Sequence, residues 1–494
     1  MDKKIKILLL CITLLGLYFR IKGVLGGYFA FTYDQGRDML AVYDLVINHK
    51  FSLIGPTTGL AGIFYGPWWY WFMAPFFAIS GGDPKIILLA VVLVNTSMIP
   101  IIFFLGRELW NKEIGVCLSI MVAFVPFFIS SSVQLWSPNL VPFFTLLSLF
   151  LLWRTIKNKK LTTFFLLGTT LGLIQEGEVA YGVIYTIGVI SALLYLKFII
   201  KEKIQAKGLF TLLSGFILVI LPRLLFDLRH KFLIFQSTVD YLLKPKIYQV
   251  KLSLAERFIS RIESFFSLFS KTAAAENKLI ALVIALFSAT LLIRYVYSVN
   301  NQNSRVNHFI KAILVLLLLF FSIFIIYPDA LWEYYIIGLP IVYLILIGAT
   351  LFSIKKFYPS IFIPYSILLI LVSTSPLRLI QSYNTYWEGN ESVYRNQIEV
   401  VNWIYQDADK HNFSVEVYTP SLIDYPYQYL FLWYGKKKFG YLPVNDNKLV
   451  YYILEGPKDG WGRTRFLKDR EGDGNIVSEK IVQAGITVQK RQRT

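Results

Sequence analysis

Long apolar runs separated by short polar stretches dominate the chain up to about residue 380. A helix needs about 20 apolar residues to cross the hydrocarbon core of a bilayer. Eleven runs reach or approach that length: 5–25, 86–106, 114–134, 138–153, 161–176, 179–199, 208–226, 279–297, 311–328, 333–353 and 357–379. The pattern predicts an all-α polytopic membrane protein with about 11 transmembrane helices.

Lysine and arginine are concentrated in alternate loops, such as residues 154–160 and 197–207. Basic loops face the cytoplasm. The short loops between them contain neither lysine nor arginine: 134–138, 176–178 and 328–333. We therefore expect a multi-pass protein of the cell membrane (plasma or inner), with a cytoplasmic N-terminus and a first run retained as a signal anchor.

Three long segments then fall on the extracytoplasmic side: loops 26–85 and 227–278, and residues 380–494. The last segment is polar and rich in turns. Its residues 394–410 have helical spacing, whereas two stretches alternate like strands, 414–420 and 449–455. The sequence predicts a transmembrane domain (1–379) followed by a small extracytoplasmic soluble α/β domain (380–494).

Composition supports this division. Of the 494 residues, 55% are hydrophobic and 16% are charged, against about 25% charged in soluble proteins. The formal charge is +18, but residues 380–494 carry 15 Lys/Arg against 14 Asp/Glu, or +1. Basic loops in the membrane part therefore explain the excess, and no nucleic-acid partner is expected. Cys11 and Cys117 lie in separate apolar runs, so no disulfide framework is expected.

Charged residues gather at the extracytoplasmic ends of the predicted spans, and none lies at the centre of a span. They include the acids and base of residues 34–38, the acids of residues 176–178, Arg223, and the stretch DLRHK (227–231). A transporter normally binds its substrate near the midplane. This pattern favours chemistry at the outer interface, on a molecule with a lipid tail and a polar, phosphorylated head.

The stretch TYDQGRD (residues 32–38) predicts a helix start. Thr32 and Gln35 have the spacing of a capping box, which places the first helical residue at about Tyr33. Gly36 costs about 1 kcal/mol relative to alanine in a helix. We therefore expect something to approach the backbone closely at Gly36.

Three charged residues follow one another within this turn. Asp34 falls where the helix dipole favours an anion. Arg37 and Asp38 are its i+3 and i+4 neighbours, which lie on the same helix face. The spacing alone fits a surface ion pair as well as a catalytic site.

These motifs, together with GIFYGPWWYWFMAP (62–75) and LFDLRHKF (225–232), resemble the family 39 membrane glycosyltransferases. That family includes protein O-mannosyltransferases and lipid A aminoarabinose transferases, within the GT-C superfamily. The resemblance covers residues 1–380 and is strongest over 26–110. It implies a GT-C-like catalytic domain that transfers a hexosyl or pentosyl group from a polyprenyl-phosphate-linked donor. The acceptor would be a cell-envelope lipid, glycan or protein on the extracytoplasmic face.

The resemblance matches Asp34 to the catalytic first-loop acid, which would assist the attacking acceptor hydroxyl. Many relatives have a second acid where this chain has Gln35, which leaves Asp38 as the candidate second carboxylate. The candidates for binding the donor phosphate are Arg37, Arg223, Arg229 and His230. The candidates for binding acceptor or sugar are Tyr65, Trp68, Glu176 and Glu178.

Several assignments have simpler alternatives. Arg223 and Arg229 also fit interfacial anchors, and Tyr65 and Trp68 also fit an aromatic belt. No cofactor is implied with certainty, and a divalent metal ion held by the two glutamates stays open. The competing functions are a membrane transporter or flippase, a polymerase or ligase of lipid-linked glycans, and a non-enzymatic scaffold.

Overall fold

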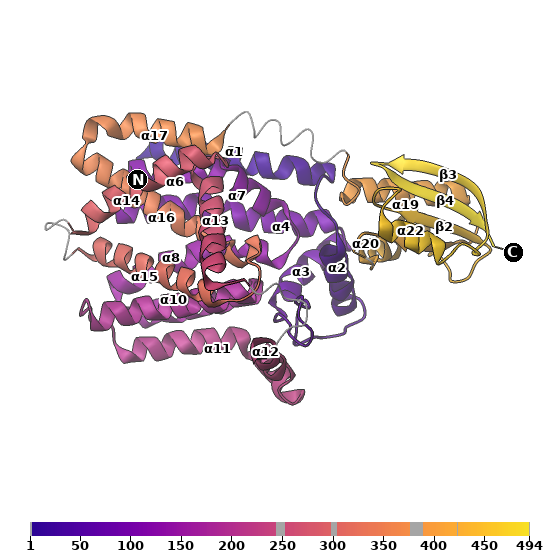
Figure 1. The fold of residues 1–494 in the computed structure, drawn as a ribbon, viewed down its shortest axis with the longest axis horizontal. Coiled ribbons are helices and arrows are strands. Elements are labelled where there is room, and N and C mark those ends of the chain that lie inside the picture. Colours follow the sequence, from indigo (N-terminus) through magenta and orange to yellow (C-terminus); the bar gives the residue numbers. More distant parts are fainter. Residues whose placement is uncertain (1, 244–251, 298–303, 376–388, 422, 494) are drawn as a thin grey trace.

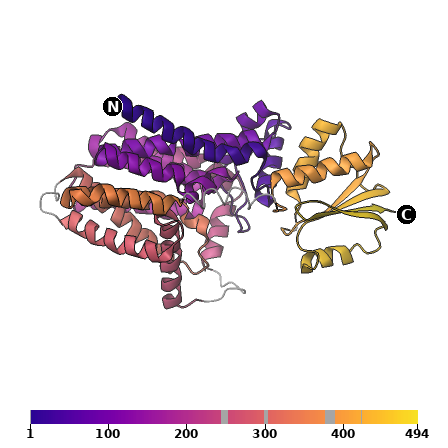
Figure 2. The same cartoon turned by 90° about the horizontal axis from the view of Figure 1, so that it is seen from above.

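The computed structural model describes residues 2–243, 252–297, 304–375, 389–421 and 423–493. Its helices form a bundle, and a small sheet domain lies beyond one end of that bundle (Figures 1 and 2). The N-terminus lies at the opposite end. The predicted boundary between residues 379 and 380 lies outside the described residues.

Each of the eleven predicted runs coincides with a helix or a broken pair of helices. They are α1 (Lys3–Gly26), α4 (Pro84–Thr96) with α5 (Met98–Leu109), α6 (Lys112–Phe124) with α7 (Pro126–Ser130), α8 (Val141–Asn158), α9 (Leu161–Gly177), α10 (Val179–Phe198), α11 (Ala206–Arg229), α14 (Lys278–Tyr297), α15 (Arg305–Ile326), α16 (Leu339–Phe357) and α17 (Pro359–Thr374). Within the described residues, eight spans are long and apolar enough to cross a membrane, or nine if the bent pair counts as one. The fold class is confirmed. The count of 11 is not, because α9 and α17 have only 17 and 16 residues.

The break between α6 and α7 is held by a buried arginine. The two helices meet at a bend of 58°, which leaves carbonyl groups at the end of α6 without helical partners. Arg20, on α1, donates to the carbonyls of Val122 (2.8 Å), Ala123 (3.0 Å) and Phe128 (3.3 Å), and to the Ser132 hydroxyl (3.1 Å). These bonds offset the cost of burying the charge.

Four helices fill the two long loops: α2 (Tyr33–Val46), α3 (Trp68–Ser80), α12 (Leu233–Leu243) and α13 (Leu254–Ala273). The α13 helix runs across the direction of the spans (Figure 1). Its Arg261 donates to the carbonyls of Phe324 (3.1 Å) and Tyr327 (3.1 Å), at the C-terminal end of α15. That contact satisfies carbonyls which the helix leaves unpaired.

The C-terminal region contains α19 (Tyr394–Ala408), β1 (Ser414–Tyr418), α20 (Tyr425–Leu430), η5 (Phe431–Gly435), α21 (Lys436–Phe439), β2 (Leu449–Leu454), α22 (Trp461–Lys468), β3 (Asn475–Gln483) and β4 (Ile486–Gln492). The predicted helix and both predicted strands are therefore present. The sheet order is β1-β2-β4-β3, with β1 and β2 parallel and β4 antiparallel to both of its neighbours.

This sheet domain shares one apolar core with α2, α3 and α4. Two backbone hydrogen bonds join the segment after α1 to the start of α19: Phe31 N–H to the Ser392 carbonyl (2.8 Å), and Tyr394 N–H to the Phe29 carbonyl (3.0 Å). The sheet domain is therefore fixed against the end of the bundle that carries α2.

Candidate active site

The α2 helix begins at Tyr33, as the sequence predicts. The side-chain carbonyl of Gln35 accepts hydrogen bonds from the backbone N–H of Thr32 (2.9 Å) and from the Thr32 hydroxyl (2.6 Å). Because Gln35 is buried and committed to the helix start, it does not stand in for a second acid at the site.

Arg37 links the two carboxylates of α2. Its Nη1 lies 3.0 Å from the Asp34 carboxylate, and its Nη2 lies 2.9 Å from the Asp38 carboxylate. The Asp34 side chain is 37% exposed, whereas that of Asp38 is 0% exposed. Both acids therefore contact Arg37, as their spacing predicts, and of the two only Asp34 has an exposed carboxylate.

Asp38 is surrounded by donors from α3. The Trp69 indole N–H donates to it at 2.8 Å and the Tyr70 hydroxyl at 3.3 Å, in addition to the Arg37 guanidinium. Burial raises the pKa of Asp38 to about 6, and the Arg37 charge opposes that rise. At neutral pH the carboxylate is ionised and its acceptor positions are filled.

Gly36 is the point where the sheet domain meets α2. A Cβ atom at Gly36 would lie 2.3 Å from the Pro426 nitrogen and 2.4 Å from the Tyr425 carbonyl carbon, both of α20. The Tyr425 ring also contacts the Tyr33 ring, with centroids 5.0 Å apart. The close approach expected at Gly36 is thus made by this chain's own sheet domain.

Glu176 and Arg223 form a buried ion pair between α9 and α11. The Arg223 Nη2 lies 3.1 Å from the Glu176 carboxylate. A Cβ atom at Gly66 would lie 1.4 Å from a carboxylate oxygen of Glu176, so a larger residue there would require the Glu176 side chain to move. The loop before α3 therefore rests directly on this acid.

Glu178 lies beside Tyr65, whose hydroxyl donates to its carboxylate at 2.9 Å. Burial raises the pKa of Glu178 to about 7, against the lowering effect of that hydrogen bond. Tyr334, on the short helix η4 (Glu333–Ile336), lies near this group and near Asp34. Burial raises the pKa of Tyr334, and the negative charges of Glu178 and Asp34 raise it further. Asp34, Tyr65 and Glu178 are thus brought to one region.

The remaining candidates lie along α11. The Trp68 indole donates to the Val219 carbonyl of α11 at 2.6 Å, one turn before Pro222. His230 stacks on Phe226, with ring centroids 3.9 Å apart, and its Nδ1 donates to the Phe226 carbonyl. Arg229 is exposed.

The sequence did not single out Tyr334, although a tyrosine-rich loop (327–336) is visible in it. Nor did it single out Arg20, which lies near the outer end of the first run. Within the described part of the chain, no group of three or more His, Cys, Asp or Glu side chains could hold a metal ion.

The fold and the site define a class: a polytopic membrane protein with an exposed acid, Asp34, paired with a half-buried arginine at the end of its bundle. The model of the dolichyl-phosphate-mannose-protein mannosyltransferase family matches residues 65–226. This match includes Tyr65, Glu176 and Arg223, and it begins after Asp34. It confirms the resemblance to family 39-like enzymes of the GT-C superfamily, although the stretch TYDQGRD lies outside it.

Solved structures agree in fold. The structure of ArnT from Cupriavidus metallidurans bound to undecaprenyl phosphate has a TM-score of 0.61 at 11% identity, covering 99% of this chain and 98% of that one. Its apo form has a TM-score of 0.56 at 10% identity, covering 98% and 97%. The apo oligosaccharyltransferase of Archaeoglobus fulgidus has a TM-score of 0.52 at 12% identity, covering 86% of this chain and 63% of that one. No curated protein matches the sequence.

Proposed function

We propose that this protein is an integral membrane glycosyltransferase that uses a polyprenyl-phosphate-linked sugar and acts at the extracytoplasmic face of the cell membrane. The observation that carries the proposal is the accessible Asp34 carboxylate, held by an arginine that a second, fully buried acid fixes in place. The match to a mannosyltransferase family and the fold shared with ArnT, which was solved with undecaprenyl phosphate, support the donor class.

In the proposed reaction, Asp34 accepts the proton of the acceptor hydroxyl as its oxygen attacks the anomeric carbon. A new glycosidic C–O bond forms, and the bond to the phosphate oxygen breaks with its electron pair on the phosphate. General-base help of this kind is worth about 10²–10⁴-fold. A phosphate leaves as a stable anion, so the site does not require the protonating acid that glycosidases use.

Asp38 is better placed as a positioning residue than as a catalytic one. Its carboxylate has no exposed surface and accepts from Arg37, Trp69 and Tyr70. By fixing one side of the Arg37 guanidinium, it orients the side that faces Asp34.

Among the four candidate cations, Arg229 is the best placed for the donor phosphate. Arg37 and Arg223 already neutralise carboxylates. Arg229 is exposed and, within the described residues, has no ion-pair partner. It offers the bidentate geometry that phosphate favours. His230, held by the Phe226 carbonyl and ring, flanks it.

The four acceptor-side candidates shape the wall of the site. Tyr65 and Trp68 give their polar hydrogens to Glu178 and Val219. Glu176 supports the backbone at Gly66. We propose that these contacts hold the aromatic loop in a form against which a sugar or a prenyl chain can pack.

The experiment is sugar transfer by the purified protein in proteoliposomes. Mass spectrometry of copurifying lipids first identifies the donor, and transfer from that donor is then measured. Asp34→Asn should lower turnover by about 100-fold or more and leave the melting temperature unchanged. Asp44→Asn, an exposed change on the same helix, is the matched control. Near-normal turnover in Asp34→Asn would remove that residue from the reaction.

A further inference from the structure

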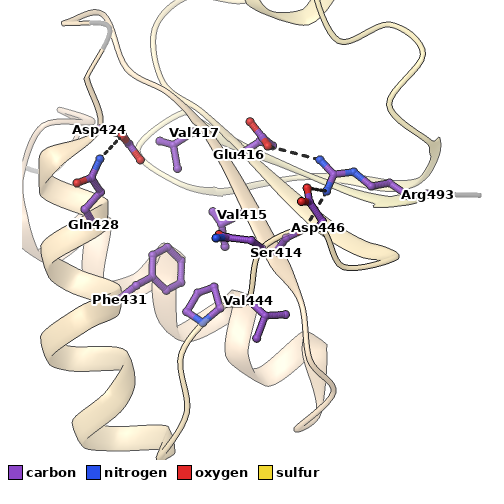
Figure 3. Close-up of a pocket in the computed structure, with 12 residues that line it drawn as sticks. Ser414, Val415, Glu416, Val417, Asp424, Gln428, Phe431, Val444, Asp446 and Arg493 are labelled. Carbon is purple, nitrogen blue, oxygen red and sulfur yellow. Dashed lines mark hydrogen bonds and ion pairs between the residues drawn. The ribbon is translucent and has the colours of Figure 1, made fainter.

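A cleft of about 350 Å³ lies along β1 in the sheet domain, outside the site described above (Figure 3). Four consecutive residues of β1, Ser414 to Val417, line it. The facing wall comes from α20 and η5, through Asp424, Gln428 and Phe431, and from the loop of residues 443–446. Arg493 closes one end.

The lining shows that the cleft lies against the edge of β1. Successive side chains of a strand point to opposite faces. A cavity that touches four residues in a row therefore cannot lie over one face alone. Within the part of the chain that the structure describes, β1 is the terminal strand of the sheet and pairs with β2 alone, so the cleft contains the backbone edge that has no neighbouring strand there.

The direction of the backbone groups follows from two hydrogen bonds. The Tyr418 carbonyl accepts from Glu455 N–H, at the end of β2, so Tyr418 faces β2. In a parallel pair of strands, the backbone groups of successive residues point alternately toward and away from the neighbouring strand. The N–H and C=O groups of Val415 and Val417 therefore point away from β2, toward the cleft. The carbonyl of Phe413, two residues before Val415, points to the same side and accepts a hydrogen bond from Val444 N–H. The loop of residues 443–446 therefore hydrogen-bonds to this edge at Phe413, before the outward groups of Val415 and Val417.

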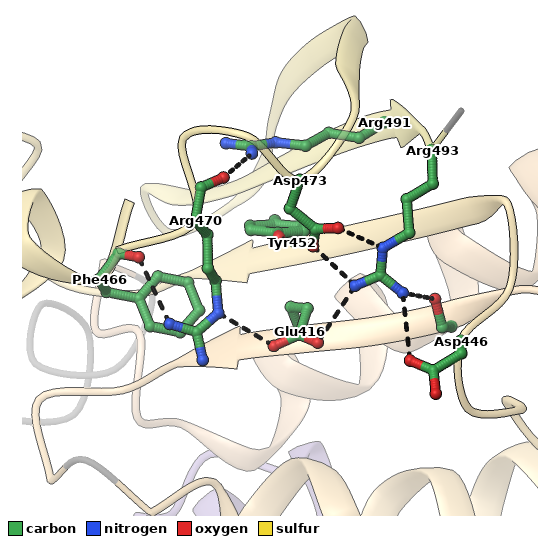
Figure 4. Close-up of polar contacts among 9 residues, drawn as sticks. Glu416, Asp446, Tyr452, Phe466, Arg470, Asp473, Arg491 and Arg493 are labelled. Atoms are coloured by element: carbon green, nitrogen blue, oxygen red, sulfur yellow. Dashed lines mark hydrogen bonds and ion pairs between the residues drawn. The ribbon is translucent and has the colours of Figure 1, made fainter. Parts of the chain in front are cut away.

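The cleft is apolar on one side and negatively charged at its rim. Val415 and Val417 of β1 and Phe431 of η5 supply apolar lining (Figure 3). Three lining residues are acids and one is basic, and the acids are Glu416, Asp424 and Asp446. Arginines pair with two of these acids: Arg493 contacts Glu416 at 3.4 Å and Asp446 at 3.9 Å, and Arg470 contacts Glu416 at 3.2 Å (Figure 4). Arg493 also contacts Asp473 at 2.5 and 2.6 Å. Among the described residues, Asp424 is the lining acid that has no cation beside it, and Asp446 is fully exposed.

We propose that the open edge of β1 binds an extended, positively charged stretch of polypeptide, which pairs as an added strand. Outward N–H and C=O groups beside apolar pockets are the requirements of strand addition. The acidic rim selects a basic segment. An oligosaccharide offers no matching ladder of backbone groups, and Phe431, the one aromatic ring among the described lining residues, is nearly buried.

The position of the cleft links it to the candidate active site. Tyr425, next to the lining residue Asp424, contacts Tyr33, which precedes Asp34. If the proposed function holds, the bound polypeptide is the acceptor, and its class is a protein with hydroxyl side chains near a basic segment. This last step rests on the proposed function, whereas binding at the β1 edge does not.

Binding is tested with the full chain in detergent by fluorescence anisotropy. The probe is a fluorescein-labelled decapeptide of alternating threonine and valine with two lysines at each end. The control probe has glutamates in place of the lysines. The lysine peptide should bind, and the glutamate peptide should bind at least tenfold more weakly.

Val417→Pro removes one outward N–H and keeps the ladder to β2, because proline is tolerated on edge strands whose N–H faces outward. It should weaken binding about tenfold. Val417→Ala, which retains the N–H, is its matched control. Asp446→Asn, at a fully exposed site, should weaken binding about two- to threefold without affecting folding.

The outcomes separate the two proposals. Absence of lysine-peptide binding, equal binding by Val417→Pro with an unchanged melting temperature, or selective binding of chitotriose would each overturn the cleft proposal. Sugar transfer to a lipid acceptor alone would overturn the assignment of the bound polypeptide as acceptor, and it would leave binding at the β1 edge and the proposed function standing. Peptide binding with no sugar transfer from any polyprenyl-phosphate donor would support the cleft and reject the glycosyltransferase.

Discussion

Asp34 and Asp38 lie one helical turn apart, yet their surroundings differ completely. Both carboxylates contact Arg37, but only Asp38 is enclosed, by Trp69 and Tyr70 of α3. A buried charge is stable only when its partners are in place. Under the proposed function the two acids therefore have different roles, Asp34 toward the substrate and Asp38 in support of Arg37.

Replacing Asp38 with asparagine should destabilise the fold. The substitution leaves the Arg37 guanidinium without one of its two anions in a buried setting, which costs about 3 kcal/mol. The melting temperature of the detergent-solubilised protein, followed by tryptophan fluorescence, should fall, and transfer activity should fall with it.

The comparison with Asp34→Asn gives the control for that experiment. Asp34 is partly exposed, so its loss should reduce activity alone. An Asp38→Asn variant with wild-type stability and no activity would instead assign Asp38 a direct role in the chemistry.

At the scale of single residues, the sequence predicted the helix start and the contacts between residues within one helical turn. The start at Tyr33 and the Asp34–Arg37 pair follow from local spacing. The burial of Asp38 does not, because its enclosing donors, Trp69 and Tyr70, come 31 and 32 residues later. The position of Trp69 and Tyr70 against α2 depends on the loop before α3, which packs on Glu176 at Gly66.

At the scale of elements, the contact between α2 and α20 has no spare room at Gly36. The backbone of Tyr425 and Pro426 occupies the space that a side chain would need. Glycine here is costly for the helix and necessary for the contact. Helix propensity favours alanine at this position and the contact with α20 requires glycine, so a substitution here distinguishes the two effects.

Gly36→Ala should separate these effects. Alanine favours the helix by about 1 kcal/mol, so a purely local role predicts a more stable protein. We expect the reverse, a lower melting temperature and faster proteolytic release of the sheet domain, because a Cβ atom would meet α20 backbone.

Gly59→Ala is the matched control, since a Cβ atom at Gly59 would have no atom within 4 Å. Equal behaviour of the two variants would mean that the α2–α20 contact does not hold the sheet domain in place.

The spans could be predicted because a bilayer demands long apolar helices wherever the chain crosses it. Interruptions inside the spans could not. The break after Phe124 depends on hydrogen bonds from Arg20, about a hundred residues earlier in the chain. The hairpin of β3 and β4 was also missed, because β3 is exposed along most of its length and lacks the alternation of a half-buried strand.

At the scale of the whole molecule, the sheet domain contains a buried acid near its contact with the bundle. Glu455 accepts hydrogen bonds from the Gln397 side chain (3.1 Å) and the Tyr427 hydroxyl (2.9 Å). Burial raises the pKa of Glu455 to about 7, and the nearby charge of Glu391 adds to the rise.

Stability should therefore fall as the pH rises from about 4.5 to 7. In that window the folded protein keeps the Glu455 proton and the unfolded chain has lost it, so the folded state binds more protons. The loss is of the order of 3 kcal/mol, because each unit of pKa shift corresponds to about 1.4 kcal/mol.

Glu455→Gln should flatten the decline of melting temperature between pH 5 and pH 8. Part of the slope should remain, because burial also raises the pKa of Glu178 and of Asp38. An unchanged slope in the variant would show that Glu455 is not the group that titrates.

The pairing of Phe29 and Phe31 with Ser392 and Tyr394 also orders events during synthesis of the chain. Phe29 and Phe31 leave the ribosome early, whereas Ser392 and Tyr394 are synthesised only after the membrane spans. Until then, α2 has no α20 against Gly36. Under the proposed function, a nascent or prematurely terminated chain would therefore occupy the bilayer before the contact between α2 and α20 forms, and sugar transfer would begin only in the last fifth of translation.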